Sequence, residues 1–130
     1  MRKILYLIRG VPGAGKSTIA AYLVERCCRH SADDYFTTYP NGRMEYKFDA
    51  GKLQQAHKAC LDAVKRNIAD LQPRIVVANT FTKREHMLPY YELANKAGYE
   101  VVEITVKSNF KSIHNVPAEV VERMRKEFEP

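Results

Sequence analysis

The first apolar segment of the chain is a short unbroken run at residues 4–8. An unbroken run is typical of a strand buried on both faces of a parallel sheet, because a half-buried strand alternates apolar and polar residues. A glycine-rich segment follows, and from Lys16 onward Ile19, Leu23 and Cys27 recur at helical spacing. The pattern therefore predicts a strand, a glycine-rich turn and a helix, in that order.

The middle of the chain predicts a long helix followed by a second strand. Asp49 is placed to cap the helix, which ends before Pro73, and residues 75–78 form another apolar run. His57 lies beside the apolar stripe of this helix, so we expect a packed core histidine, with a site residue as the alternative. The stripe consists of Leu53, Ala56, Cys60, Leu61, Val64 and Ile68.

The last third of the chain predicts two more helices around one strand. Thr82 with Glu85 fits a capping box for a helix that stops at Gly98, and Pro89 kinks or restarts that helix. Residues 101–106 predict a strand. Pro117 then suits the first position of a closing helix that buries Val120, Val121, Met124 and Phe128.

Alternation of strands and helices indicates parallel pairing, with a ligand site at the carboxyl ends of the strands. A very short further strand is possible at residues 29–31. We expect an α/β fold, a three-layer sandwich in which helices flank a small parallel sheet. At 130 residues the chain predicts a single domain, 1–130.

Composition narrows the class of protein only slightly. The apolar share of 45% and the charged share of 28% are typical of a globular protein. A net charge of +6 favours a polyanionic partner, although a mildly basic surface has the same signature. Three cysteines without a metal-ligand spacing, and no stretch that could span a membrane, lead us to expect a reduced cytoplasmic protein.

The glycine-rich turn carries the strongest chemical signal. It satisfies G-x-x-x-x-G-K-[ST] at every fixed position, directly after a predicted strand. Glycines let backbone N–H groups converge on phosphate oxygens, Lys16 reaches the β and γ phosphates, and Ser17 is the candidate Mg²⁺ ligand. The sequence therefore predicts that ATP and Mg²⁺ bind at Gly10, Val11, Pro12, Gly13, Ala14, Gly15, Lys16, Ser17 and Thr18.

Other motifs decide between classes of phosphate-loop protein. The string nearest to a guanine-reading element, residues 95–98, lacks its aspartate, and the strand at 75–78 leads into Asn79 and Thr80 where motor ATPases carry acidic residues. A small kinase needs a carboxylate near the γ-phosphate. Asp33 is the candidate base, and its neighbour Asp34 has a structural or substrate-binding role.

Several strings together resemble the polynucleotide 5′-kinase family, with its phage members and the related AAA-type and zeta-toxin-like ATP-binding domains. They are the phosphate loop, residues 31–36, 46–49, 56–57, 79–80, 89–90 and 114–117. The resemblance implies transfer of the ATP γ-phosphate to a nucleic acid 5′ end, with Asp33 as base. It also implies a cytoplasmic location, in the host if the protein is phage-encoded.

The sequence departs from this family at three places. Phe36 stands where the family often has a substrate-gripping arginine, and Ala78 stands where it has an acidic residue before Asn79 and Thr80. The lid arginines are also missing, which leaves Lys107 and Lys111 as nearby cations. Lys111 is therefore a candidate phosphate contact, and Arg43, Asn79 and Thr80 are candidate substrate contacts; for the lysines and Arg43 a solvated loop is the alternative.

Three functions stay open at this point. The first is a polynucleotide 5′-hydroxyl kinase, the second is a kinase of a nucleoside, nucleotide or other small molecule, and the third is a non-catalytic ATP-binding module. An enclosed acceptor pocket would favour the second over the first. The nature of the acceptor and the oligomeric state are not predicted.

Overall fold

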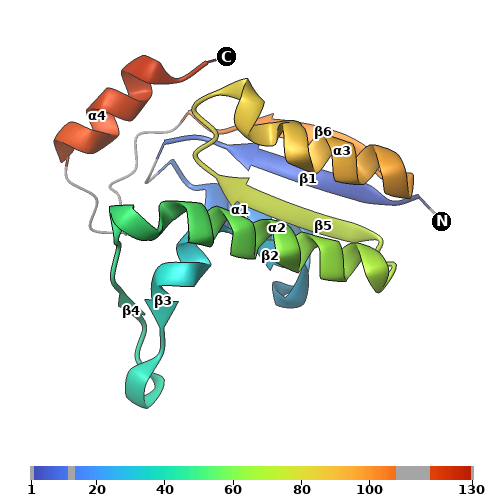
Figure 1. Cartoon of the computed structure of the whole chain (residues 1–130), viewed down its shortest axis with the longest axis horizontal. Helices are drawn as coiled ribbons and strands as arrows, with labels where there is room; N and C mark the ends of the chain where they lie inside the picture. The colour runs from blue at the N-terminus through green and yellow to red at the C-terminus, as the bar shows by residue number, and fades with distance from the viewer. Residues whose placement is uncertain (1, 12–13, 108–117, 130) are drawn as a thin grey trace.

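The computed structural model describes residues 2–11, 14–107 and 118–129. Its centre is a four-stranded parallel sheet with the strand order β2-β5-β1-β6 (Figure 1). The strands are β1 (Ile4–Arg9), β2 (Arg29–His30), β5 (Arg74–Asn79) and β6 (Glu100–Thr105). Pairing is in register at the strand ends, so Arg9 lies beside Asn79 on one side and Thr105 on the other. This edge is where the chain continues into the glycine-rich turn.

Helices cover both faces of the sheet, which confirms the three-layer α/β sandwich. Helices α2 (Leu53–Ala69) and α3 (Leu88–Ala97) pack on the face that carries Leu5, Leu7, Ile75 and Val77. Helix α1 (Lys16–Leu23) packs on the other face, against Ile8, Val76 and Ala78. Alternating side chains of β1 and β5 thus fill two separate cores, as expected of strands buried on both sides.

Helix α1 is shorter than the apolar spacing predicts. Val24 has an extended backbone and packs into the α1 face of the sheet, so the helix ends at Leu23. Cys27 therefore lies in a separate 3-10 turn, η1 (Arg26–Cys28), and its side chain is exposed. The predicted place of Cys27 on the buried stripe of the first helix was wrong, because packing of Val24 overrides the helical period.

Between β2 and α2 the chain forms a segment that the sequence did not predict. A 3-10 turn, η2 (Ala32–Phe36), leads into a small hairpin of β3 (Thr37–Thr38) and β4 (Glu45–Tyr46), with the turn η3 (Pro40–Gly42) between them. Figure 1 shows this hairpin extending away from the sheet. Asn41 and Gly42 both have positive φ at its tip, at 55° and 78°.

The start of α2 follows the prediction, but its buried face does not. Asp49 accepts a hydrogen bond from the Gly51 N–H at 2.9 Å and caps the 3-10 turn η4 (Ala50–Lys52) that leads into the helix. The buried positions are Ala56, Cys60, Val64 and Asn67, so the stripe is rotated slightly from the predicted one. His57 consequently lies on the exposed side of α2, and the expectation of a packed core histidine was wrong.

Helix α3 begins differently from the prediction and ends as predicted. The turn η5 (Arg84–Met87) precedes it, and its N-cap is Lys83 without a side-chain cap, so Thr82 and Glu85 do not form a capping box. Glu129 takes that place, because its carboxylate accepts from the Arg84 N–H at 3.0 Å. Pro89 lies in the first turn of α3, which is the predicted restart, and Gly98 ends the helix with a φ of 77°.

The closing helix α4 (Ala118–Glu127) lies at the carboxyl ends of the strands (Figure 1). Met124 and Phe128 are half-buried, which confirms part of the prediction. Pro117 and the side chains of Val120 and Val121 lie outside the described residues.

The fully buried Arg9 donates to the carbonyl oxygens of Phe81 at 2.7 Å and Glu129 at 2.5 Å. Its guanidinium also lies 4.4 Å from the Phe128 ring centroid. Arg9 therefore connects the two residues that follow α4 to the end of β1.

No helix within the described ranges is both long and apolar enough to cross a bilayer.

Gly98→Ala is expected to lower the free energy of unfolding by about 1–2 kcal/mol, because a side chain in the left-handed region is strained even where space is open. Chemical denaturation measures this change. Gly42→Ala is the matched comparison, since Gly42 also has a positive φ, 78°, and open space at its Cβ position. A loss in only one of the two variants would contradict a backbone origin.

Candidate nucleotide-binding site

The glycine-rich turn depends on its glycines for two different reasons. A Cβ atom on Gly10 would lie 2.7 Å from the carbonyl oxygen of Val106, so only glycine lets the end of β1 pass this close to the chain after β6. Gly15 has a φ of 100° and is the N-cap of α1. Pro12 and Gly13 lie outside the described residues, whereas Val11 and Ala14 are buried.

The amino end of α1 fits an anionic ligand. Its N-cap is a glycine, without a side-chain hydrogen bond to the first turn, and the first turn carries no acidic residue. Backbone N–H groups at a helix start are not used within the helix, and they carry its partial positive charge. Ser17 and Thr18 are exposed at this end. The arrangement is suited to phosphate oxygens.

Lys16 folds back over the turn that precedes it. Its Nζ donates to the carbonyl oxygens of Gly10 at 2.7 Å and Val11 at 3.0 Å. Burial lowers the pKa of Lys16 to about 8, and the negative charge of Asp33 opposes that change. The charge of Asp33 thus acts on Lys16, and the roles of the two residues as base and phosphate-binding lysine remain predictions.

The turn η2 fixes both aspartates. Ser31 is its N-cap: the Ser31 Oγ accepts from the Asp33 N–H at 3.1 Å, and the Asp34 carboxylate accepts from the Ser31 N–H at 3.1 Å. Tyr46, on β4, donates its hydroxyl to Asp33 Oδ1 at 2.8 Å. Burial, followed by the charge of Asp33, raises the pKa of Tyr46, so the phenol stays protonated as a donor. Partial burial also raises the pKa of the Asp34 carboxyl.

Asn79 and Thr80 position the site from the end of β5. The buried Asn79 Oδ1 accepts from the Ala32 N–H at 2.8 Å and from the Ser31 hydroxyl at 3.3 Å. The carbonyl oxygen of Thr80 accepts from the Gly10 N–H at 3.2 Å. These bonds connect β5 to the aspartate turn on one side and to the phosphate loop on the other. Contact of either side chain with a substrate remains a prediction.

The other predicted substrate and phosphate contacts remain predictions. Arg43 is exposed in the β3–β4 hairpin, immediately after η3. Lys111 lies outside the described residues, and Lys107 is exposed after β6.

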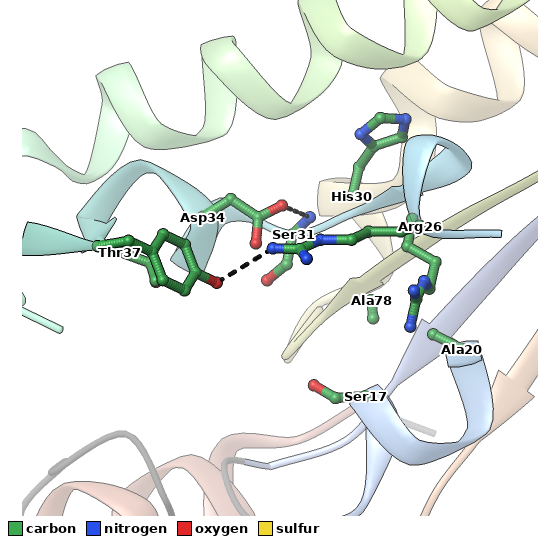
Figure 2. Close-up of a pocket in the computed structure, with 10 residues that line it drawn as sticks. Ser17, Ala20, Arg26, His30, Ser31, Asp34, Thr37 and Ala78 are labelled. Atoms are coloured by element: carbon green, nitrogen blue, oxygen red, sulfur yellow. Dashed lines mark hydrogen bonds between the residues drawn. The ribbon is translucent and has the colours of Figure 1, made fainter. Parts of the chain in front are cut away.

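A cavity of about 700 Å³ opens beside the phosphate loop. Figure 2 shows Ser17 and Ala20 of α1 on one side and Arg26, His30 and Asp34 on the other, with Ala78 of β5 between them. Arg29, Thr37 and Tyr39 complete the wall. Sequence reasoning missed the basic members, Arg26, Arg29 and His30, for which the signal was the pair Arg29 and His30 directly before Ser31.

The oxygen donors of this wall fit a hard cation such as Mg²⁺. Ser17, from the first turn of α1, and Asp34 line the same cavity, and Mg²⁺ typically takes one or two protein oxygens together with substrate phosphates and water. Within the described ranges, no group of three His, Cys, Asp or Glu residues could hold a metal ion by itself. The protein would therefore hold Mg²⁺ through Ser17, with the nucleotide supplying further ligands.

The site consists of a strand, a glycine loop and a helix whose lysine folds onto the loop. This arrangement defines a P-loop nucleotide-binding domain with a kinase-like fold. Comparison with protein families agrees, because residues 5–130 match the model of an AAA domain. The chain belongs to this AAA domain family of P-loop proteins.

Two curated relatives are similar over most of the chain. NEDD4-binding protein 2 of Homo sapiens is 33% identical over 138 residues, which cover 97% of this chain and 8% of that protein. The 2′,3′-cyclic-nucleotide 3′-phosphodiesterase of Rattus norvegicus is 29% identical over 117 residues, covering 84% of this chain and 25% of that protein. The chain thus corresponds to a small part of each relative.

Two solved structures share the fold. Kti12 of Chaetomium thermophilum, in complex with ADP-AlF3, has a TM-score of 0.63 at 18% identity, covering 97% of this chain and 80% of that one. The APS kinase CysC of Mycobacterium tuberculosis, as a Cys556Ala mutant, has a TM-score of 0.54 at 16% identity, covering 96% and 94%. These likenesses confirm the P-loop fold predicted from the sequence.

Binding of ATP above pH 8 is expected to take up protons. Free Lys16 loses its proton near pH 8, and bound phosphates raise its pKa by their negative charge. Affinity should therefore fall by up to about tenfold per pH unit above pH 8. Calorimetry at pH 8.5 in two buffers of different ionisation enthalpy counts the protons.

Lys16→Arg is the control for this titration, because a guanidinium keeps its charge throughout the range. Its ATP affinity should not change with pH, and Lys16→Ala should lose ATP binding while its thermal unfolding stays cooperative. Equal pH dependence in wild type and Lys16→Arg would assign the titration to another group.

Proposed function

We propose that this domain transfers the γ-phosphoryl group of ATP to an acceptor hydroxyl, with the 5′-hydroxyl of a polynucleotide as the leading acceptor. The observation that carries the proposal is that one strand end contacts both parts of the site: the Thr80 carbonyl accepts from the Gly10 N–H of the phosphate loop, and the Asn79 side chain accepts from the Ala32 N–H of the turn that carries Asp33. The pair concerned is Asp33 and Lys16. A phosphoryl transferase needs this pair, one group for the proton and one for the phosphate.

The proposed step conserves atoms and charge. The acceptor oxygen forms a bond to the γ-phosphorus in line with the leaving group, while the bond from that phosphorus to the β–γ bridging oxygen breaks and ADP leaves. The proton of the acceptor hydroxyl passes to the Asp33 carboxylate. Bound Mg²⁺, held through Ser17, would neutralise charge on the phosphate oxygens.

The surrounding residues prepare each group for this role. Tyr46 donates to one oxygen of Asp33 and thereby fixes the orientation of the carboxyl. Asn79 holds the start of the aspartate turn. Ser17 lines the cavity in which we place the acceptor, so the nucleotide and the acceptor would meet at the first turn of α1.

A kinase of a small nucleotide is a second candidate. The observation that favours it is the cavity, because about 700 Å³ is enough to enclose a nucleotide-sized acceptor. One relative bears a name that refers to a cyclic nucleotide, the 2′,3′-cyclic-nucleotide 3′-phosphodiesterase of Rattus norvegicus. A non-catalytic ATP-binding module is the remaining alternative.

Asp33→Asn is expected to keep ATP affinity and to reduce transfer by about 10²–10⁴-fold, since the amide cannot take the proton. The measurement is transfer of label from γ-labelled ATP, with Mg²⁺, to a 5′-hydroxyl oligonucleotide and separately to free nucleosides. Asp62→Asn is the control, because Asp62 forms a surface ion pair with Lys58 on α2.

Label on the oligonucleotide supports the leading acceptor, and label on the nucleosides alone supports the second candidate. ATP binding without transfer to any acceptor supports the non-catalytic module. Full activity of Asp33→Asn would remove Asp33 from its proposed role.

A further inference from the structure

The cavity beside the phosphate loop has more positive than negative charge in its wall. Arg26 and Arg29 line it, with His30 beside them, and Asp34 is the acidic residue among its described lining. The Asp34 carboxylate is already hydrogen-bonded to the Ser31 N–H. The wall thus has two guanidinium groups and one carboxylate that is already hydrogen-bonded, and this excess of positive charge favours an anionic ligand.

Arg26 is held only weakly within the protein. Its Nη2 lies 3.5 Å from the hydroxyl of Tyr39, and its guanidinium lies 5.9 Å from the centre of the same ring. Figure 2 shows the Arg26 side chain reaching into the space between η1 and Thr37. Arg26 forms no ion pair with any residue that the structure describes. Its donors are therefore available to a ligand.

Arg29 carries a donor that the fold does not use. Its Nε is buried and has no hydrogen-bond partner among the described residues. Buried donors without a partner are rare in folded proteins, and each calls for an explanation such as a ligand. Arg29 belongs to β2, an edge strand of the sheet, so its backbone position is fixed by the pairing with Val76.

The resembled kinases often carry an arginine that binds substrate phosphate at the position of residue 36, and this protein has no cation there. Phe36 stands at that position and is buried with Ala32 and Ala56, with the Tyr46 ring beside it. A side chain at position 36 therefore serves the core of the aspartate turn. Any cation that holds an acceptor phosphate has to come from another element.

We propose that Arg26 and Arg29 bind a phosphate group of the acceptor, so that the cavity takes a nucleotide with a free 5′-hydroxyl and a phosphate on its 3′ side. This assignment rests on the proposed phosphoryl transfer and specifies its acceptor. We place the hydroxyl toward Ser17 and the phosphate toward Arg26, which Figure 2 shows across the cavity from Ser17; Arg29 also lines the cavity. Tyr39, 54% exposed, offers a ring face on which the base stacks.

The test measures binding without ATP. Calorimetry compares thymidine 3′-monophosphate with thymidine, which differ only in the phosphate. Wild type should bind the phosphorylated ligand about tenfold or more tightly, as charge-assisted hydrogen bonds to two arginines imply. This preference should disappear in Arg26→Gln and in Arg29→Gln, and Arg26→Lys should recover part of it.

Arg66→Gln is the matched control, because Arg66 is exposed on α2 and does not line the cavity. It should keep the full preference, and all variants should keep ATP affinity. Arg26 is exposed, so its variants test the proposal even if Arg29→Gln fails to fold. A phosphate preference that survives in Arg26→Gln, or the absence of any preference in wild type, would overturn the assignment.

A thymidine dinucleotide with a 5′-hydroxyl separates two sources of the same phosphate. Binding equal to that of the monophosphate supports an internucleotide phosphate, as in a polynucleotide, and weaker binding supports a free nucleotide. Transfer without phosphate preference would leave the proposed function intact and reject this inference alone. A phosphate preference without any transfer would support phosphate binding by the two arginines and reject the proposed phosphoryl transfer.

Discussion

The hydrogen bonds of the Asn79 side chain connect the two halves of the site. Asn79 ends β5, the strand between β1 and β2, and its buried amide oxygen accepts from the Ala32 N–H and the Ser31 hydroxyl. The neighbouring Thr80 carbonyl accepts from Gly10. One strand end therefore contacts both the aspartate turn and the phosphate loop, so the sheet helps to hold Asp33 and Lys16 at the same edge.

The sequence was sufficient for the parts of this arrangement that are local. The unbroken apolar runs and the spacing of Gly10, Gly15 and Lys16 identify the phosphate loop and its flanking strand and helix, because both the loop geometry and the strand burial depend on neighbouring residues. The Gly98 helix stop is equally local, since it depends on one backbone angle. Asp33 was expected near the loop because it follows the short strand possible at residues 29–31, and parallel strands end at the same edge of a sheet.

Features that depend on distant contacts were not predictable in this way. His57 and Cys27 were placed on buried stripes by their spacing, but packing of α2 and of Val24 against the sheet decided otherwise. The capping role expected of Thr82 is performed by Glu129, far away in sequence. Arg26 and Arg29 were not identified because the wall they share is formed by α1, η1, β2 and the hairpin together.

The contact between Arg9 and the last described residues has a consequence for how the chain is made. Besides the Phe81 carbonyl, the guanidinium contacts the Glu129 carbonyl and the Phe128 ring, so its surroundings depend in part on these two late residues. A ribosome must therefore have added residue 129 before the first strand acquires its final surroundings. Until then the Phe81 carbonyl is left as the acceptor for this charge, so a growing chain that has already formed its sheet still lacks part of the edge beside the glycine turn.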